Sequence, residues 1–131
     1  TEIYTLSLHD ALPISELPLV NDWPDVALAE LKPDERTAVV VLSHDHKIDD
    51  PALEAALLSP AFYIGALGSR RNHNRRVERL LQGGVKDNQV ERIHAPIGLD
   101  IGGSSAGEIA VSVIAQLIGT RNKRFSGEPT D

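Results

Sequence analysis

The stretch that decides the fold runs from Ala61 to Arg79 and reads AFYIGALGSRRNHNRRVER. Its first part, residues 61–67, is a short apolar run with aromatic and β-branched side chains, which predicts a buried strand. Gly68 and Ser69 interrupt this run, and Ser69 is a favourable N-cap for a helix that begins at the next residue. The stretch therefore predicts a strand that leads directly into the N-terminus of a helix.

A helix N-terminus at the end of a strand attracts anions, because its free backbone N–H groups and the positive end of its dipole converge on one place. Arg70 and Arg71 in the first helical turn oppose that dipole unless an anion offsets their charge. One interpretation of the turn is therefore a site for a phosphate-bearing ligand. The other is that both arginines point into water and pair with surface carboxylates, and the residues alone leave both open.

The composition excludes several classes of protein. The 131 residues suffice for one domain, or part of one, with a buried core. The absence of cysteine excludes a disulfide scaffold, a thiolate metal site and a cysteine nucleophile within this sequence. The formal charge of −6 argues against general nucleic-acid binding, and no apolar run approaches the roughly 18 residues of a membrane span. The sequence also contains no methionine, so we interpret it as a fragment of a longer product.

The first residues, 1–15, have no targeting signature, because they contain no Lys or Arg for a positively charged region. They resemble the in-frame translation of a sequencing adapter joined to a truncated reading frame. We therefore interpret them as an artefactual leader and assign no function to His9 or Asp10. A genuine N-terminal arm is the alternative, and protein-like sequence begins at Glu16 in either case.

Two strands with a helix between them are expected in residues 17–42. Residues 17–20 favour a short edge strand, and residues 22–31 favour a brief helix. Residues 37–42 are almost continuously apolar and β-branched, which is typical of a strand covered on both faces in a parallel sheet.

A polar turn, residues 43–50, follows that strand and reads SHDHKIDD. Ligands of open parallel sheets bind outside the carboxyl ends of the strands, so His44 or Asp45 is a candidate for ligand contact. His44 and His46 with Asp49 also suggest a metal site, but their spacing departs from the dinuclear pattern His-x-His-x-Asp-His. A simple polar turn is the third interpretation.

The helix after this turn is expected over residues 52–58, with Asp50 as its cap and Pro51 in its first turn. The helix that begins at residue 70 repeats arginine every four residues, at positions 71, 75 and 79, away from its apolar stripe. We interpret the later arginines as a solvated face rather than a site. Glycines at positions 83 and 84 end this helix.

The C-terminal part predicts two more helices. Residues 88–93 favour a short helix, and Ser105 and Glu108 form a capping box before a helix over residues 109–119. Apolar residues occupy most of the circumference of the second helix, so it is expected to be largely buried, either against the sheet or against another domain. Residues 121–131 are typical of a disordered tail.

A small-residue loop, HAPIGLDIGG, occupies positions 94–103. Its glycines allow close approach of the backbone to a neighbouring strand or to a ligand. His94 and Asp100 are its only side chains able to do acid–base or strong hydrogen-bond chemistry. The alternative is that they only hold a tight loop in place.

Strands that alternate with helices predict an α/β fold with a parallel sheet flanked by helices. Two clear strands and one or two weaker ones make about half of a nucleotide-binding sheet. The Gly-x-Gly-x-x-Gly turn that would open the other half is absent from the sequence. Residues 98–103 do not replace it, because no long apolar strand precedes them.

Three motifs in order, residues 43–51, 62–71 and 94–102, together resemble the XdhC/CoxI family of accessory proteins for xanthine dehydrogenase and related molybdenum hydroxylases. The resemblance covers about residues 18–120. It implies that residues 16–120 correspond to the C-terminal Rossmann-like domain of that family, as a partial parallel sheet. The first glycine-rich turn of the family and the smaller domain before it have no counterpart in the sequence.

The resemblance implies a cytoplasmic maturation factor rather than a catalyst. Members bind molybdenum cofactor, assist the exchange of an oxo for a sulfido ligand, and hand the cofactor to the apo-hydroxylase. The partner implied is therefore an apo-hydroxylase of the xanthine dehydrogenase type, with a cysteine desulfurase and a homodimer as further candidates. Neither nucleic acid nor a membrane is implied. The pterin dithiolene holds the metal in this picture, so the protein need not supply metal ligands.

The cofactor-binding residues follow from the same motifs. Molybdopterin carries a phosphate, and the Gly-Ser-Arg-Arg turn at positions 68–71 offers an anion site for it. The alternative function is an NAD(P)-binding oxidoreductase, in which this turn holds a 2′-phosphate or pyrophosphate and His44 or His94 donates a proton. The complete set of expected cofactor-binding residues is Ser43, His44, Asp45, Gly65, Gly68, Ser69, Arg70, Arg71, His94, Gly98 and Asp100, with no catalytic residue or metal ligand assigned.

Overall fold

The computed structural model describes residues 2–4 and 18–126, so most of the expected leader and the last part of the expected tail lie outside the described residues. Strand β1 (Glu2–Tyr4) pairs antiparallel with β2 (Leu19–Asn21). The remaining elements, in chain order, are α1 (Pro24–Leu31), β3 (Ala38–Val41), α2 (His46–Leu58), β4 (Tyr63–Ala66), α3 (Arg70–Gln82), α4 (Asp87–Val90), β5 (Ile93–His94) and α5 (Ala106–Ser126).

The central sheet has the strand order β3-β4-β5, and its strands are all parallel. Ile64 at the centre of β4 pairs with Val39 of β3 on one side and with Ile93 of β5 on the other. Every residue of β4 is buried, as its continuous apolar run predicts. The expected α/β fold with a parallel sheet flanked by helices is therefore confirmed.

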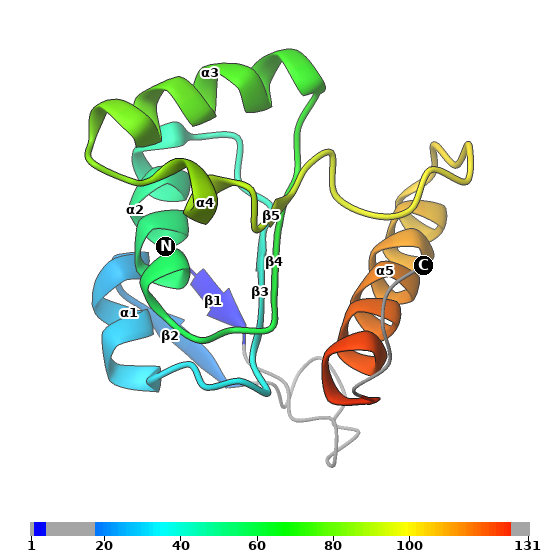
Figure 1. The fold of residues 1–131 in the computed structure, drawn as a ribbon, viewed down its shortest axis with the longest axis horizontal. Coiled ribbons are helices and arrows are strands. Elements are labelled where there is room, and N and C mark those ends of the chain that lie inside the picture. The colour runs from blue at the N-terminus through cyan, green and yellow to red at the C-terminus, as the bar shows by residue number, and fades with distance from the viewer. Residues whose placement is uncertain (1, 5–17, 127–131) are drawn as a thin grey trace.

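Helices cover both faces of this sheet (Figure 1). On one face α2 packs against the strands, with α3 and α4 beside it, and Leu53 of α2 is completely buried there. On the other face lies α5, which contacts Tyr63 of β4 and Ile97 through a smaller apolar cluster that includes Val113. The sheet is therefore the middle layer of a three-layer arrangement.

The second face combines apolar packing with hydrogen bonds. The Tyr63 hydroxyl donates to Oε1 of Gln116 at 2.7 Å, and the Gly98 N–H donates to the same oxygen at 3.0 Å. The sheet covers only part of α5, because Val111 is 63% exposed and Ile114 is 53% exposed, so the expected burial of the rest of this helix against another domain stays a prediction. The distribution of apolar residues around a helix can be read from the sequence, but the sequence does not show how much of the helix surface its neighbours cover.

Helix α2 begins earlier than expected. The Asp45 carboxylate accepts a hydrogen bond from the Lys47 N–H at 2.9 Å, so Asp45 and not Asp50 is the N-cap. Pro51 consequently lies inside the helix. The predicted helix over residues 52–58 is therefore confirmed, but it covers only the second part of α2.

The last helices also differ in extent from the predictions. The short helix α4 ends at Val90, because the next residues turn into β5 rather than continuing to residue 93. The capping box of α5 is confirmed, since Ser105 Oγ accepts from the Glu108 N–H at 3.2 Å and Glu108 accepts from the Ser105 N–H at 3.1 Å. The helix then continues to Ser126, where the sequence predicts a disordered tail.

Candidate functional site

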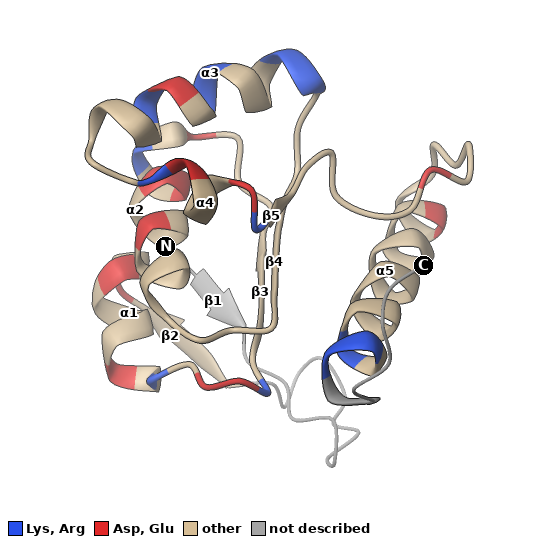
Figure 2. Ribbon diagram, viewed as in Figure 1, with Lys and Arg blue, Asp and Glu red and all other residues tan. Residues whose placement is uncertain are grey.

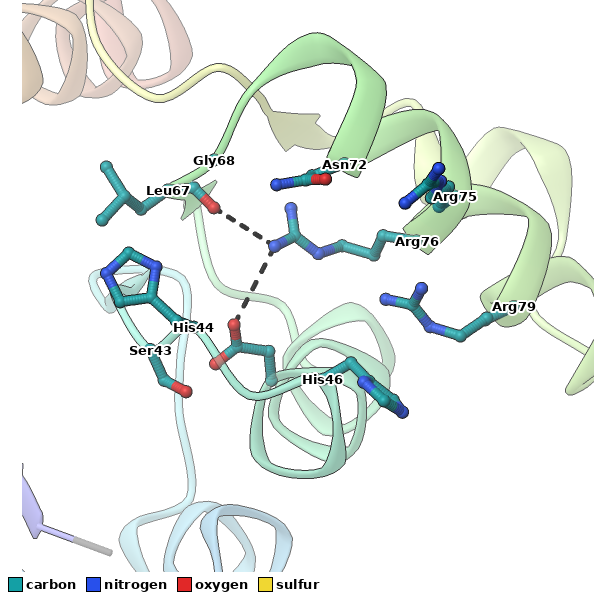
Figure 3. A pocket seen from close by; sticks show the side chains of 10 residues that line it. Ser43, His44, His46, Leu67, Gly68, Asn72, Arg75, Arg76 and Arg79 are labelled. Carbon is teal, nitrogen blue, oxygen red and sulfur yellow. Dashed lines mark hydrogen bonds and ion pairs between the residues drawn. The ribbon is translucent and has the colours of Figure 1, made fainter.

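The parallel topology brings two turns to one edge of the sheet. Strand β3 leads into α2 through residues 42–45, and β4 leads into α3 through residues 67–69. The carboxyl ends of parallel strands lie at the same edge, so the N-termini of both helices meet there. A pocket of about 210 Å³ opens at this edge (Figure 3), and it is lined by Ser43, His44, His46, Asp49, Leu67, Gly68, Asn72, Arg75, Arg76 and Arg79.

Capping interactions build the two turns. Ser43 Oγ accepts from the Asp45 N–H at 2.9 Å, and Asp45 in turn caps α2. Ser69 Oγ accepts from the Asn72 N–H at 3.2 Å and caps α3. The polar side chains that the sequence offers for ligand contact at positions 45 and 69 therefore also hold the turns in place, while His44 lines the pocket and is exposed.

Basic residues from α3 form one wall of the pocket, although the formal charge of the chain is −6. Figure 2 shows the Lys and Arg positions along α3 in blue. Arg75 is exposed. Arg79 makes a two-pronged ion pair with Asp50, in which Nε lies 2.7 Å from Oδ2 and Nη2 lies 3.3 Å from Oδ1. Arg79 keeps 37% of its side chain exposed, so the face expected to be solvated also forms a wall of the pocket.

The sequence motifs did not identify Arg76 as a site residue. It is the most deeply buried cation of the pocket, with 6% of its surface exposed. Its Nη2 donates to the Leu67 carbonyl oxygen at 3.2 Å and lies 3.9 Å from Oδ2 of Asp49. Its Nε and Nη1 have no hydrogen-bond partner. A signal for its burial exists in the sequence, because Arg76 precedes the buried Leu80 by one helical turn and so lies on the same face of α3.

Asp49 is the buried carboxylate of the pocket, with 3% of its surface exposed. Burial is the largest cause that raises the pKa of Asp49 above its ordinary value, and the carboxylates of Asp50 and Asp45 act in the same direction. A hydrogen bond with the Ser43 side chain and the charge of Arg76 act against this rise. Its Oδ1 has no hydrogen-bond partner. Asp49 and Arg76 are therefore a buried pair with unused hydrogen-bonding capacity on both members.

The arginines expected at the anion site are outside the pocket. Arg70 and Arg71 are exposed, and neither lines the pocket. Gly68 does line it, with a φ of +137° that favours glycine, and a Cβ at this position would lie 3.8 Å from Nη2 of Arg76. The anion site at the turn stays a prediction, and the guanidinium closest to it in this pocket is that of Arg76.

Four further expected residues lie away from the pocket. A Cβ at Gly65 would lie 2.6 Å from Cδ1 of Ile97, so the space beside this glycine is filled by the protein. His94 stacks on the Tyr63 ring with centroids 4.7 Å apart, and burial lowers its pKa. Gly98 is held by Gln116, as described above, and Asp100 is exposed. Their proposed contact with a cofactor stays a prediction.

Metal binding finds no further support. Although His44, His46 and Asp49 line one pocket, residues 2–4 and 18–126 contain no group of three or more His, Asp or Glu side chains that could hold a metal ion. Within the same part of the chain, none of the helices has the length and apolar character needed to cross a membrane.

Known proteins share this parallel α/β fold. A family model described as the XdhC Rossmann domain matches residues 7–117. The chain belongs to the XdhC Rossmann domain family. This confirms the resemblance found in the three sequence motifs.

Relatives of this XdhC domain have informative names. The chain is 37% identical over 99 residues to the molybdenum cofactor insertion chaperone PaoD of Escherichia coli. This match covers 76% of this chain and 30% of that protein. It is 33% identical over 105 residues to a Bacillus subtilis protein named as a probable xanthine dehydrogenase subunit, and this match covers 80% of this chain and 30% of that protein.

A solved structure supports the same relationship. The crystal structure of a protein described as a xanthine dehydrogenase from Bacillus halodurans matches with a TM-score of 0.66 and 29% sequence identity. The match covers 84% of this chain and 31% of the solved chain. The XdhC domain described here therefore spans about a third of the length of these relatives.

Proposed function

We propose that this XdhC domain binds molybdenum cofactor at the carboxyl edge of its sheet and serves in the maturation of hydroxylases of the xanthine dehydrogenase type. The basic pocket between α2 and α3 is the observation that carries this proposal. It is supported by family membership and by relatives named as a molybdenum cofactor insertion chaperone and a probable xanthine dehydrogenase subunit. The pocket has the charge needed to hold the phosphate of molybdopterin.

Five of the residues expected from the sequence have a place in this proposal, in two groups. Ser43, His44 and Gly68 line the pocket and would contact the cofactor directly. Arg70 and Arg71 lie in the adjoining first turn of α3 and would attract its anionic group from outside. When bound, the cofactor would supply a metal held by its own dithiolene, so these residues bind and orient and do not ligate the metal.

The finer steps are proposals of the same kind. The domain would assist the exchange of an oxo for a sulfido ligand, with a cysteine desulfurase as sulfur donor, and would then deliver the cofactor to the apo-hydroxylase. Delivery requires reversible binding, which suits a partly open pocket more than a sealed one. A homodimer and a cytoplasmic location complete the proposal.

Titration of the full chain with molybdopterin and, separately, with NADPH tests the proposal. We expect molybdopterin to bind with an affinity that falls as salt rises, because the charged contacts of an open pocket are screened. The loaded protein should restore activity to a cofactor-free hydroxylase of the xanthine dehydrogenase type. Binding of NADPH without binding of molybdopterin would instead favour the NAD(P)-dependent oxidoreductase, since the same pocket offers charge for a dinucleotide phosphate.

A further inference from the structure

We propose that Arg76 is the buried anchor of a phosphate subsite, and that Asp49 is the carboxylate it releases when a phosphate binds. The inference rests on the proposed function in one respect, namely that the pocket between α2 and α3 is the ligand site. It adds the chemical class of the ligand group, the residue that holds it, and a competing group within the protein.

The first observation is the unused hydrogen-bonding capacity of Arg76. This side chain lines the pocket with 6% of its surface exposed, yet its Nε and Nη1 have no partner. A buried charged donor without a partner is strongly unfavourable, because it has lost its water and gained nothing in exchange. A ligand oxygen atom that accepts from these donors would remove this cost.

The second observation is that Asp49 is an incomplete partner for Arg76. The 3.9 Å between Arg76 Nη2 and Asp49 Oδ2 is too long for a hydrogen bond, and Asp49 Oδ1 also has no partner. Buried ion pairs offset their desolvation only when hydrogen bonds accompany the attraction. The raised pKa of Asp49 agrees with this, because burial is its largest cause and acts more strongly than the charge of Arg76. A phosphate could therefore replace Asp49 as the partner of Arg76.

The surroundings favour a phosphate over a carboxylate ligand. Arg75 adds a second positive charge on the same wall, whereas Arg79 is already held by Asp50 and does not compete for the ligand. Gly68 places no side chain above Nη2 of Arg76. A guanidinium offers two parallel N–H donors that can bind two phosphate oxygens at once. The multiple negative charge of a phosphate or diphosphate can also interact favourably with two arginines.

Asn72 precedes Arg76 by one turn of α3 and so lies on the same face of that helix. This exposed side chain lines the pocket and lies next to the Arg76 guanidinium in Figure 3. We expect it to move when the phosphate enters. Arg70 and Arg71 remain exposed to solvent, where salt screens their charge, so their contribution should be smaller than that of Arg76.

The test uses inorganic phosphate and pyrophosphate as probes, titrated into the full chain by calorimetry. Arg76→Gln should weaken the binding of the preferred probe about ten- to a hundred-fold, the effect of losing charge-assisted hydrogen bonds. Asp49→Asn keeps the shape of the side chain but removes the competing charge, so it should tighten binding several-fold. Arg36→Gln, which removes an equal charge at an exposed position that does not line the pocket, should leave the affinity unchanged.

Equal affinity of Arg76→Gln and the unaltered protein for both probes would overturn the subsite. If Arg76→Gln does not fold, Asp49→Asn decides, because tighter binding supports the proposal and unchanged or weaker binding overturns it. Preference for pyrophosphate would identify the diphosphate of a nucleotide-extended ligand as the source. Preference for phosphate would identify a monoester such as that of molybdopterin itself, and either preference supports the subsite if it depends on Arg76.

This outcome is separable from that of the proposed function. If pyrophosphate or phosphate binding depends on Arg76 while molybdopterin does not bind at all, the subsite stands and the proposed function fails. If molybdopterin binds equally tightly to Arg76→Gln and to the unaltered protein, the proposed function stands and the subsite fails.

Discussion

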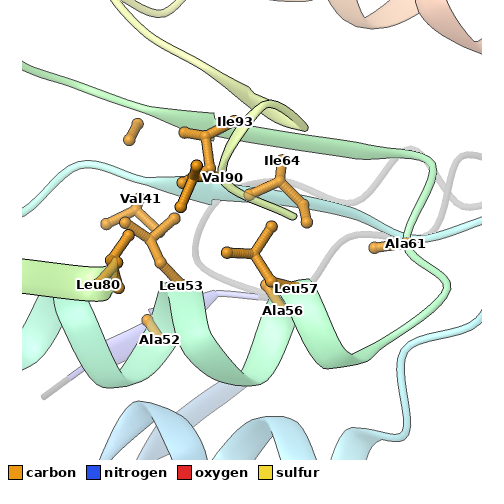
Figure 4. Close-up of a cluster of buried hydrophobic side chains, with 11 residues drawn as sticks. Val41, Ala52, Leu53, Ala56, Leu57, Ala61, Ile64, Leu80, Val90 and Ile93 are labelled. Atoms are coloured by element: carbon orange, nitrogen blue, oxygen red, sulfur yellow. The ribbon is translucent and has the colours of Figure 1, made fainter. Parts of the chain in front are cut away.

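The two faces of the central sheet are held in different ways. Beneath α2 lies a wholly apolar cluster, in which Leu53 and Ile64 are completely or almost completely buried (Figure 4). Beneath α5 a smaller cluster surrounds Tyr63, and its position depends on the two hydrogen bonds accepted by Gln116. Apolar packing is not directional, whereas hydrogen bonds have narrow distance and angle ranges. We infer that the first face supplies stability and the second sets where α5 lies.

Truncation in the first cluster should have the largest effect on folding. Leu53→Ala removes a side chain that is 0% exposed and leaves a cavity between α2 and the sheet, so it should lower the free energy of unfolding by about 2–5 kcal/mol. Urea denaturation measures this change. Leu58→Ala on the same helix is the matched control, because Leu58 is 81% exposed and its loss should change stability by less than about 0.5 kcal/mol. Similar losses of stability for both variants would contradict the inference that the apolar cluster beneath α2 supplies stability.

A polar change on the second face should have an intermediate effect. Gln116→Ala leaves the Tyr63 hydroxyl and the Gly98 N–H without their acceptor, which should cost about 1–3 kcal/mol. The two hydrogen-bonding partners make this a case for a double-mutant cycle. In a Tyr63→Phe background the substitution at Gln116 should cost less, since the hydroxyl that needs the acceptor is gone. Strict additivity of the two changes would show that the hydrogen bond does not link α5 to the sheet.

The smallest effect should come from the start of α5. Hydrogen bonds from the backbone and side chain of Ser105 lower the pKa of Glu108 below its ordinary value. Its contribution to stability is therefore fully present above the ordinary glutamate pKa and is lost as the pH falls through the lower pKa of the folded state. Unfolding measured as a function of pH should show this loss, and Glu108→Gln should reduce it. A pH profile unchanged by the substitution would remove Glu108 from the cap.

Local patterns predicted the elements whose determinants are local. The strand at Ile64, the Ser69 cap and the capping box of Ser105 and Glu108 each depend on neighbouring residues, and the structure confirms all of them. The start of α2 was not predictable in this way, because Asp45 and Asp50 are both good caps in sequence. The side chain of Asp50 is instead taken by Arg79, from another helix.

The same distinction applies to the candidate site. Ser43, His44 and Gly68 follow strands of a parallel sheet, so topology alone places them at the edge where the pocket lies. Helical spacing from Leu80 places Arg76 on the buried face of α3, but its pairing with Asp49 depends on how α3 packs against α2, and no repeat along the sequence reports that contact. The exposure of Ile114 likewise depends on how much of the surface of α5 its neighbours cover.

Gly65 gives the middle strand a spacing function. A methyl group at this position would lie 2.6 Å from Cδ1 of Ile97 and 2.8 Å from Cε1 of Tyr63, closer than carbon atoms approach one another. Ile97, in the loop after β5, packs closely against the Gly65 backbone because this residue has no side chain. The next residue in the loop, Gly98, donates its N–H to Gln116 of α5. Alanine at position 65 would therefore force the Ile97 side chain or the Tyr63 ring to shift, and because both belong to the apolar cluster that contacts α5, the change would disturb the packing of that helix.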